Sequence, residues 1–444
     1  MSAPLIERIA AEHAATADSL PSAVVPRARR KRALDSLIAR GLPTSREENW
    51  RYASLRALER VRFAPPASGA GGGREQLPAA VEGFARFVFI DGRFAAELSD
   101  PTAPPGGVIV DLGSRAAGTA TIPAEPDPER GDEGAFALLN DAFAVDGAHV
   151  RVGSQRTDHS GTTAEAVARV EIIHLASAPA ERGASYPRIR VDVAERARLE
   201  LIERHVGPAE SASFIDSAVE LRVQAGAVVE HFRLQQLGAR ALWVDTLSAS
   251  VARGASYRLH SFGFGAQSAR STQTVRLLGD GAETGLYSIC TGDHRQVLDS
   301  YALVEHAAAR TRTEEIFRGI AAGRARVAFN GKIIVRPGAP GADSSQSLRG
   351  LLAGPEAEID VRPQLEIYTD DVRCSHGATT GKLDEAMLFY LLSRGLDRDQ
   401  AQRLLKWAFL EDVVARVAVP ALRRQIETSL ADQIRERDGL KELL

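Results

Sequence analysis

The sequence predicts a mainly β protein with a helical region at each end. Short runs that alternate apolar and polar residues fill the middle of the chain, which is typical of half-buried strands. Turn glycines separate these runs, and no convincing helical crossover lies between them. Many short strands with little helix are typical of a β-solenoid or a β-sandwich. Because no clean repeat of fixed length is visible, the residues alone leave both folds open.

Four segments follow from this pattern. We expect an N-terminal helical region (1–64), a linker rich in glycine and proline (65–82), a β core (83–373) and a C-terminal helical domain (374–444). In the β core, the apolar residues that share a face of a run are Ile189, Val191 and Val193; Leu199 and Leu201; Val219, Leu221 and Val223; Phe232 and Leu234; Tyr257 and Leu259; and Val275 and Leu277.

Composition excludes several classes of protein. The 444 residues are 44 % hydrophobic and 25 % charged, which is ordinary for a globular chain with two or three buried cores. The net charge of −3 gives no electrostatic reason to expect nucleic acid as a partner. The N-terminus MSAPLIERIAAEHAA is charged where a signal peptide needs an apolar run, and no uncharged stretch approaches the roughly 18 residues of a membrane span. We therefore expect a cytoplasmic protein that binds neither nucleic acid nor membrane, with its two cysteines as free thiols.

The N-terminal region predicts a helix that ends at Gly41, since apolar side chains lie at helical spacing in RARRKRALDSLIAR. The basic residues of this helix are expected to form a solvated face, because no aromatic residues interleave with them (Arg27, Arg29, Arg30, Lys31 and Arg32). Trp50 and Tyr52, in PTSREENWRYASL, could dock this region on the part that follows.

The C-terminal region predicts three helices. Asp384 can cap the first, which ends near Gly395, and Asp397 with Gln400 resembles a capping box for the second. After Pro420 one apolar stripe contains Leu422, Ile426, Leu430 and Ile434.

The segment DDVRCSHGATTGKLD (370–384) carries the candidate chemistry at the border between strands and helices. If residues 372–376 are extended, Cys374 and His376 project from one face, because side chains alternate along a strand. A phosphate loop does not fit, because only three residues separate Gly377 from Gly381 and Leu383 replaces the hydroxyl that binds magnesium. We therefore expect this chain itself to bind no nucleotide.

Three interpretations of Cys374 and His376 remain open from the residues. A nucleophilic dyad is disfavoured, because neighbouring side chains on one strand point roughly parallel. A hydrolase or transferase that uses Cys374 nevertheless stays an alternative. Thiolate and imidazole suit iron or zinc, but a closed site needs about four ligands, so further ligands would come from another chain. The pair could also be two ordinary packed residues, as we expect for Cys290.

The segment DDVRCSHGATTGKLDEAMLFYLLSRGL closely resembles the SufB/SufD family of iron–sulfur cluster assembly proteins. The upstream segments HAAARTRTEEIFRGI, RVAFNGKIIVRPGA and PQLEIYTDDV are similar to the same family, and PTSREENWRYASL is similar to its SufD branch. The chain lacks the cysteine-rich segment usual in SufB, so it most resembles SufD. A SufB-like paralogue that acts as the primary cluster scaffold is the alternative. A carbohydrate-active β-helix is disfavoured by the 6 % aromatic content.

The resemblance implies a right-handed parallel β-helix with helical regions at both ends, which decides between solenoid and sandwich. It implies a scaffold subunit, not an enzyme, that pairs with SufB and with the ATPase SufC to build and hand on clusters or acquire iron, and that could form a homodimer when isolated. Cys374 and His376 match the border Cys and His of the family. The resemblance implies that they, the histidine above all, contribute to a transient iron–sulfur cluster or iron site shared with SufB. The helices from about Asp384 match the part that docks SufC.

Overall fold

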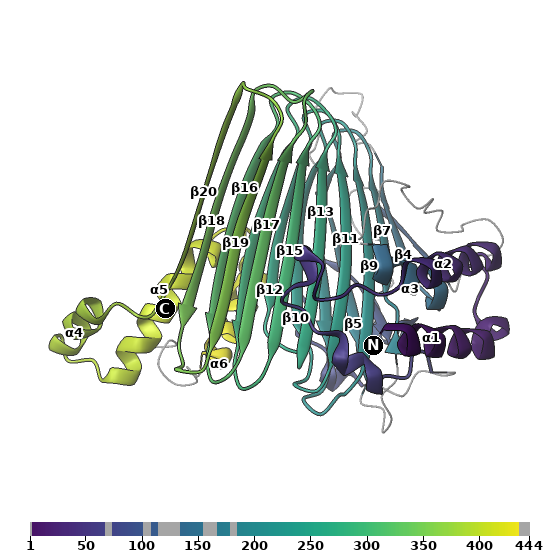
Figure 1. Cartoon of the computed structure of the whole chain (residues 1–444), viewed down its shortest axis with the longest axis horizontal. Helices are drawn as coiled ribbons and strands as arrows, with labels where there is room; N and C mark the ends of the chain where they lie inside the picture. Colours follow the sequence, from purple (N-terminus) through teal and green to yellow (C-terminus); the bar gives the residue numbers. More distant parts are fainter. Residues whose placement is uncertain are drawn as a thin grey trace.

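The centre of the molecule is a parallel β-solenoid in which consecutive strands alternate between two facing sheets (Figure 1). The computed structural model describes residues 2–66, 73–100, 108–113, 134–153, 167–177 and 184–434. Seven successive strand pairs, from β7 and β8 to β19 and β20, make up the coils. Strands that neighbour each other in these coils pair in parallel, so the predicted solenoid with helices at both ends is confirmed and the sandwich is excluded.

Sheet I contains, in spatial order, β2 (Arg93–Phe94), β1 (Ala85–Ile90), β5 (Val167–Leu175), β8 (Arg198–Val206), β10 (Val228–Gln236), β12 (Ser256–Gly263), β14 (Glu283–Gly292), β16 (Arg312–Ala321), β18 (Ala342–Leu352) and β20 (Val372–Gly381). Sheet II contains β19 (Glu358–Ile367), β17 (Arg326–Val335), β15 (Val297–His306), β13 (Ser268–Leu277), β11 (Leu242–Val251), β9 (Phe214–Val223), β7 (Arg188–Val193), β4 (Ala148–Val152) and β3 (Val108–Leu112), with β6 (Ala184–Ser185) beside β9. Only the pairs β1–β2 and β3–β4 are antiparallel in the part of the chain that the structure describes.

The length of a coil varies along the solenoid. Leu242 of β11 pairs with Ser268, which lies 26 residues later, whereas Arg326 of β17 pairs with Glu358, which lies 32 residues later. Loops of different length therefore join strands of nearly constant length. A search for one fixed repeat length fails for this reason, although the coils are stacked in regular register.

The main core fills the space between the two sheets. The predicted apolar runs supply most of it, since inward side chains such as Val219, Leu247 and Val275 lie on successive strands of sheet II. Burying one such side chain contributes roughly 1.5–3 kcal/mol.

The run HFRL differs from the other five runs in the side that its apolar face takes. Phe232 and Leu234 of β10 point out of the solenoid and pack against the C-terminal helices, while His231 and Arg233 face the interior. Both faces of sheet I are covered, so an apolar stripe does not by itself identify the inside.

The N-terminal helices cover the outer face of sheet II. They are α1 (Ser2–Thr16), α2 (Arg27–Arg40) and α3 (Ala135–Phe143), with short 3₁₀ turns at Ala17–Ser19, Glu48–Trp50, Leu55–Arg60, Arg74–Gln76 and Ala96–Leu98. As predicted, α2 ends before Gly41, whose φ of +80° favours glycine. The expectation of a wholly solvated basic face is wrong for two arginines. The Arg29 guanidinium donates to Asp141 at 2.7 Å, and that of Arg30 donates to buried carbonyls.

The segment around Trp50 and Tyr52 docks on sheet II as predicted. The Arg270 guanidinium lies 4.5 Å from the Trp50 ring, and that of Arg326 lies 5.1 Å from the Tyr52 ring. Glu48 reaches further, to Arg362 on the last strand of sheet II. We call residues 48–52 the N-terminal strap.

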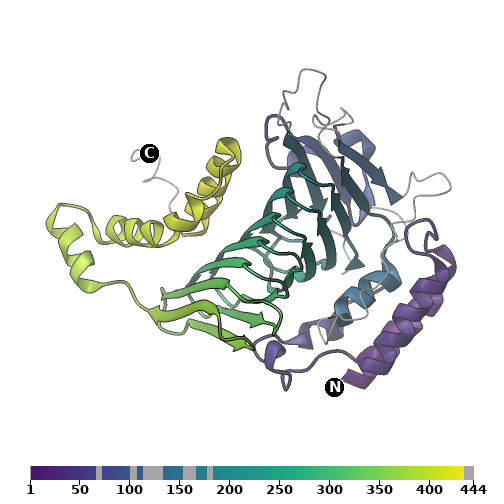
Figure 2. The same ribbon diagram turned by 90° about the horizontal axis from the view of Figure 1, so that it is seen from above.

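The three predicted C-terminal helices are confirmed as α4 (Glu385–Ser393), α5 (Arg398–Val414) and α6 (Pro420–Gln433). Asp384 caps α4, and Asp397 with Gln400 forms the predicted capping box of α5. The stripe of α6 packs with α5 on the outer face of sheet I. By contrast, α4 projects away from the solenoid (Figure 2). No helix among the described residues is long and apolar enough to cross a membrane.

The solenoid extends beyond the boundary at residue 373 that the sequence suggested. β20 continues to Gly381, because glycines that resemble a turn signal are tolerated in an edge strand. Residues 67–72 of the expected linker and residues 435–444 of the expected C-terminal domain lie outside the described residues.

Candidate metal site at the open end of the solenoid

The solenoid ends in two strands that are not covered by a further coil. β20 pairs with β18 and is the last strand of sheet I, and β19 is the last strand of sheet II, among the residues that the structure describes. No residue of β19 or β20 is buried. We call this surface the open end.

Cys374 and His376 lie on β20, so the extended backbone that the sequence predicted is confirmed. Val372 and Cys374 pack against the edge of the main core, which shows that this set of alternating side chains faces inward. Cys374 is half-buried and His376 is exposed. The structure therefore brings a thiol and an imidazole to the same face at the mouth of the solenoid.

Three oxygen-bearing side chains lie behind this pair on the preceding strands. In the ladder of sheet I, Ser344 pairs with Cys374, Gln346 with His376, and Glu315 with Gln346. The Gln346 amide nitrogen donates to the Gly331 carbonyl at 3.1 Å and to Glu315. Burial raises the pKa of Glu315 to about 7, although its hydrogen bond with Gln346 acts to lower that pKa.

Sequence reasoning missed Glu315 and Gln346. The alternation of polar and apolar residues in TEEIF and SSQSL is visible, but it does not show which stripe faces inward. Glu315 and Gln346 lie beside His376 because of the register between successive coils, and these coils differ in length. The signal that could have found them is a polar residue at the same inward position of three successive coils.

The open end supplies too few ligands for a closed metal site. Within the described ranges no group of three or more His, Cys, Asp or Glu side chains could hold a metal ion. Cys374 and His376 could provide two ligands, and a tetrahedral site or a cluster needs about four. This geometry fits a site that a second chain completes.

Cys290 and His306 are packed inside the solenoid. Burial raises the pKa of the Cys290 thiol to about 12, so it is a poor ligand and a poor nucleophile. His306 has hydrogen-bond distances of 2.8 Å to Thr311 and 2.9 Å to Thr313, and burial lowers its pKa to about 4.

A second polar cluster lies deeper, between β8, β10 and β11. The Arg233 guanidinium donates to both Glu203 and Asp245, at distances of 2.6–2.8 Å. His205 and His231 also contact Glu203 through Nε2. Burial acts to raise the pKa of Glu203, but Arg233 and the two histidines hold it well below its usual range. Because the buried charges of this cluster neutralise one another, we assign the cluster a structural role.

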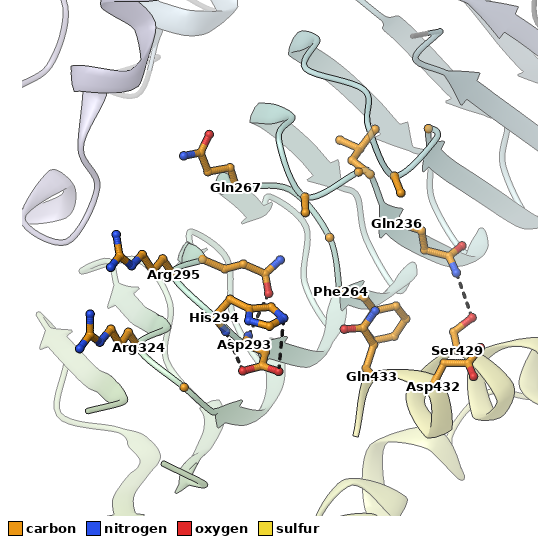
Figure 3. A pocket seen from close by; sticks show the side chains of 18 of the residues that line it. Gln236, Phe264, Gln267, Asp293, His294, Arg295, Arg324, Ser429, Asp432 and Gln433 are labelled. Atoms are coloured by element: carbon orange, nitrogen blue, oxygen red, sulfur yellow. Dashed lines mark hydrogen bonds and ion pairs between the residues drawn. The ribbon is translucent and has the colours of Figure 1, made fainter. Parts of the chain in front are cut away.

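A spacious groove lies elsewhere. It encloses about 1090 Å³ between the turns that connect sheet I to sheet II and the end of α6 (Figure 3). Its lining mixes polar and apolar residues, and Gln236 donates to Ser429 across it at 2.9 Å. Neither Cys374 nor His376 lines it.

The fold is thus a β-solenoid that presents Cys374 and His376 on its last described strand. A family model described as "SUF system FeS cluster assembly, SufBD core domain" matches residues 174–409. This match covers more than half of the chain, so the protein belongs to the SufB/SufD family, as the sequence motifs predicted.

Curated relatives agree. The chain is 28 % identical over 406 residues to the iron–sulfur cluster assembly protein SufD of Escherichia coli, covering 90 % of this chain and 91 % of the relative. It is 25 % identical over 416 residues to a SufBD family protein of Synechocystis, covering 90 % and 89 %. It is 29 % identical over 245 residues to the chloroplastic protein ABCI7 of Arabidopsis thaliana, covering 54 % and 51 %. The prediction of a SUF-system assembly subunit most like SufD is thus confirmed, and the first two relatives are named as an assembly protein and as a SufBD family protein.

Proposed function

We propose that this protein is the SufD-type scaffold subunit of a SUF complex and pairs with a SufB-type subunit through the open end. The observation that carries the proposal is an uncovered ten-residue edge strand that presents Cys374 and His376 on its inward face. An unpaired edge offers a row of backbone donors and acceptors, which a strand of another chain can complete. The isolated chain could use the same edge to form a homodimer.

The substrate of the shared site is an iron–sulfur cluster or iron that is held in transit. Cys374 and His376 supply two soft or intermediate ligands, and thiolates of the partner would complete the set. His376 is the more accessible of the two. A neutral imidazole also binds iron less strongly than a thiolate, which suits a scaffold that hands its cluster on.

The test is His376→Ala in a complex reconstituted from SufB-type, SufC-type and this subunit. The exposed side chain contributes little to folding, so the complex should assemble normally while cluster yield falls sharply. His294→Ala is the matched control, because His294 is exposed on a turn between β14 and β15 and far along the chain from the open end. Normal cluster yield in His376→Ala would contradict the proposal.

The SufC-type ATPase is proposed to dock on the C-terminal helices, chiefly on α4. Three large apolar side chains of this helix are exposed, with relative exposures of 58 % for Met387, 72 % for Phe389 and 55 % for Tyr390. Such a cluster on one short projecting helix is typical of an interaction surface. α5 and α6 instead pack on sheet I, so they hold α4 in place.

Serine at all three α4 positions should abolish co-purification of the ATPase and leave pairing with the SufB-type subunit intact. Serine at Ile38 and Leu278, two exposed apolar residues outside the C-terminal helices, is the control and should leave both partners bound. Retention of the ATPase by the α4 variant would contradict this docking site.

We further propose that the subunit is cytoplasmic and is not itself catalytic. A Cys374-dependent hydrolase is the competing function, and it lacks support because no carboxylate groups with Cys374 and His376 among the described residues. Purified chain should therefore show no hydrolysis of ATP or of activated esters. Turnover that Cys374→Ser abolishes would favour the alternative.

A further inference from the structure

The ladder behind His376 contains a hydrogen-bond acceptor without a partner. Gln346 is buried, and its Oε1 has no hydrogen-bond partner among the described residues. Its orientation is fixed, because the amide nitrogen faces two acceptors, the Gly331 carbonyl and the Glu315 carboxyl. The nitrogen and oxygen of an amide lie in one plane and diverge from the carbon that they share, so they point in different directions. With the nitrogen directed toward β16 and β17, the oxygen is directed away from them.

His376 is the ladder neighbour on that other side. It pairs with Gln346 in the parallel register of β18 and β20, and paired strands lie about 4.8 Å apart. Both side chains belong to the inward stripe that contains Cys374. A histidine that binds metal through one ring nitrogen almost always donates its other N–H to an oxygen acceptor, which fixes the tautomer.

We propose that Glu315 and Gln346 form a positioning relay for His376. Gln346 Oε1 accepts the hydrogen bond from the ring N–H that does not bind metal, and Glu315 holds the Gln346 amide in the required orientation. The relay rests on the proposed role of His376 as a ligand. The two side chains form no hydrogen bond in this structure, so the relay requires the exposed imidazole to turn toward Oε1, a rotation that needs no metal. The relay makes Gln346 and Glu315 positioning residues, which touch neither iron nor sulfur.

The relay predicts the tautomer of His376 in the metal-free protein. In a nitrogen–proton correlation spectrum of the full chain with labelled histidine, at about pH 8.5 where a free imidazole is neutral, His376 should populate one tautomer. The difference spectrum of His376→Ala identifies its signals among the ten histidines.

Substitutions then test each member. Gln346→Met keeps the length of the side chain but removes the acceptor, and should convert His376 to a mixture of tautomers. Glu315→Gln keeps an oxygen acceptor for the Gln346 amide and should preserve the single tautomer. Gln273→Met is the matched control, because Gln273 is another buried glutamine with an unpartnered Oε1, on β13. It should leave His376 unchanged.

In the reconstituted complex, Gln346→Met should lower the iron retained by about tenfold without loss of assembly. A mixture of tautomers already in the native chain, or an unchanged tautomer in Gln346→Met, overturns the relay. Normal cluster yield in His376→Ala contradicts instead the proposed function, whatever the tautomer is. The two failures are therefore distinguishable.

Discussion

The two ends of the solenoid are finished differently. At the N-terminal end, sheet I closes with the two-residue strand β2 and sheet II with the antiparallel strand β3. At the C-terminal end, the ten-residue strands β19 and β20 stop without a cap and no residue of either is buried. Short or antiparallel edge strands protect a sheet from pairing, whereas long flat edges invite it. One end is therefore closed by a short strand and an antiparallel strand, whereas the other presents two long unpaired edges among the described residues.

The buried polar groups of the middle coils and of the open end differ in their surroundings, although an unpartnered oxygen also occurs in the middle, on Gln273. In the middle coils Glu203 accepts hydrogen bonds from three side chains. At the open end Glu315 Oε1, Gln346 Oε1 and Ser344 Oγ have no partner among the described residues. Polar residues in the middle are therefore expected to act on stability, and those at the open end on assembly and ligand chemistry.

Arg233→Met should produce the largest loss of stability. It leaves Glu203 and Asp245 buried without their shared cation, which costs about 3–5 kcal/mol of unfolding free energy. Urea unfolding followed by circular dichroism measures it. Arg258→Met on β12 removes an ion pair whose arginine is half-exposed and should cost less than about 1 kcal/mol. Equal effects of the two variants would contradict a structural role for the central cluster.

Ala378→Lys should weaken pairing at the open end. Ala378 is exposed on the inward face of β20, beside buried Leu348, so a lysine there is tolerated by the free chain but is buried without a counter-ion on pairing. We expect a penalty on the order of 3 kcal/mol, or roughly 100-fold in affinity for a SufB-type subunit. Ala96→Lys places the same charge at the capped end, where affinity should not change. Unaltered affinity in Ala378→Lys would assign pairing to another surface.

Glu315 should make stability depend on pH. Its folded pKa of about 7 lies above the ordinary glutamate pKa of 4.5, so the folded state keeps a proton that the unfolded state loses. Stability from this group falls as pH rises from about 4.5 and is lost fully above about 7, a difference of about 3 kcal/mol. Glu315→Gln should therefore unfold at higher urea than the native chain at pH 8.5 and at similar urea at pH 4.5. Glu356→Gln, at an exposed turn, should leave the pH slope unchanged.

Much of this architecture could be predicted from the sequence, because local physical rules determine it. The cap at Asp384, the capping box at Asp397 and the stripe of α6 depend only on residues within a few turns. The shared apolar faces of all six runs are buried, but only five face the interior. HFRL faces outward because helices distant in sequence cover the outer face of its strand. Arg29 was expected in solvent. Its partner, Asp141, lies on α3, far along the chain, so no local pattern indicates their ion pair.

The candidate site could be predicted only in part. Cys374 and His376 share a face for the local reason that side chains alternate along a strand. Gln346 and Glu315 join them through the register of successive coils, and the loops that set this register differ in length. Sequence patterns identify the strands, but they do not show how the residues of one coil align with those of the next across loops of different length.

The smallest expected effect tests whether the capped and open ends communicate. The N-terminal strap crosses sheet II. Its first residue, Glu48, accepts hydrogen bonds from Arg362 and Gln364 of β19. Glu48→Gln removes the charge but keeps the side-chain length, and since this ion pair is partly exposed it should cost less than about 1 kcal/mol of global stability. The effect should instead appear locally, as faster amide hydrogen exchange in β19 with no change in β7.

Glu47→Gln is the control on the neighbouring residue, whose carboxylate accepts a hydrogen bond from the backbone of Thr44 within the N-terminal region. Unchanged exchange in β19 would show that the last coil holds its shape without the strap, and the open end would then be formed by the solenoid alone.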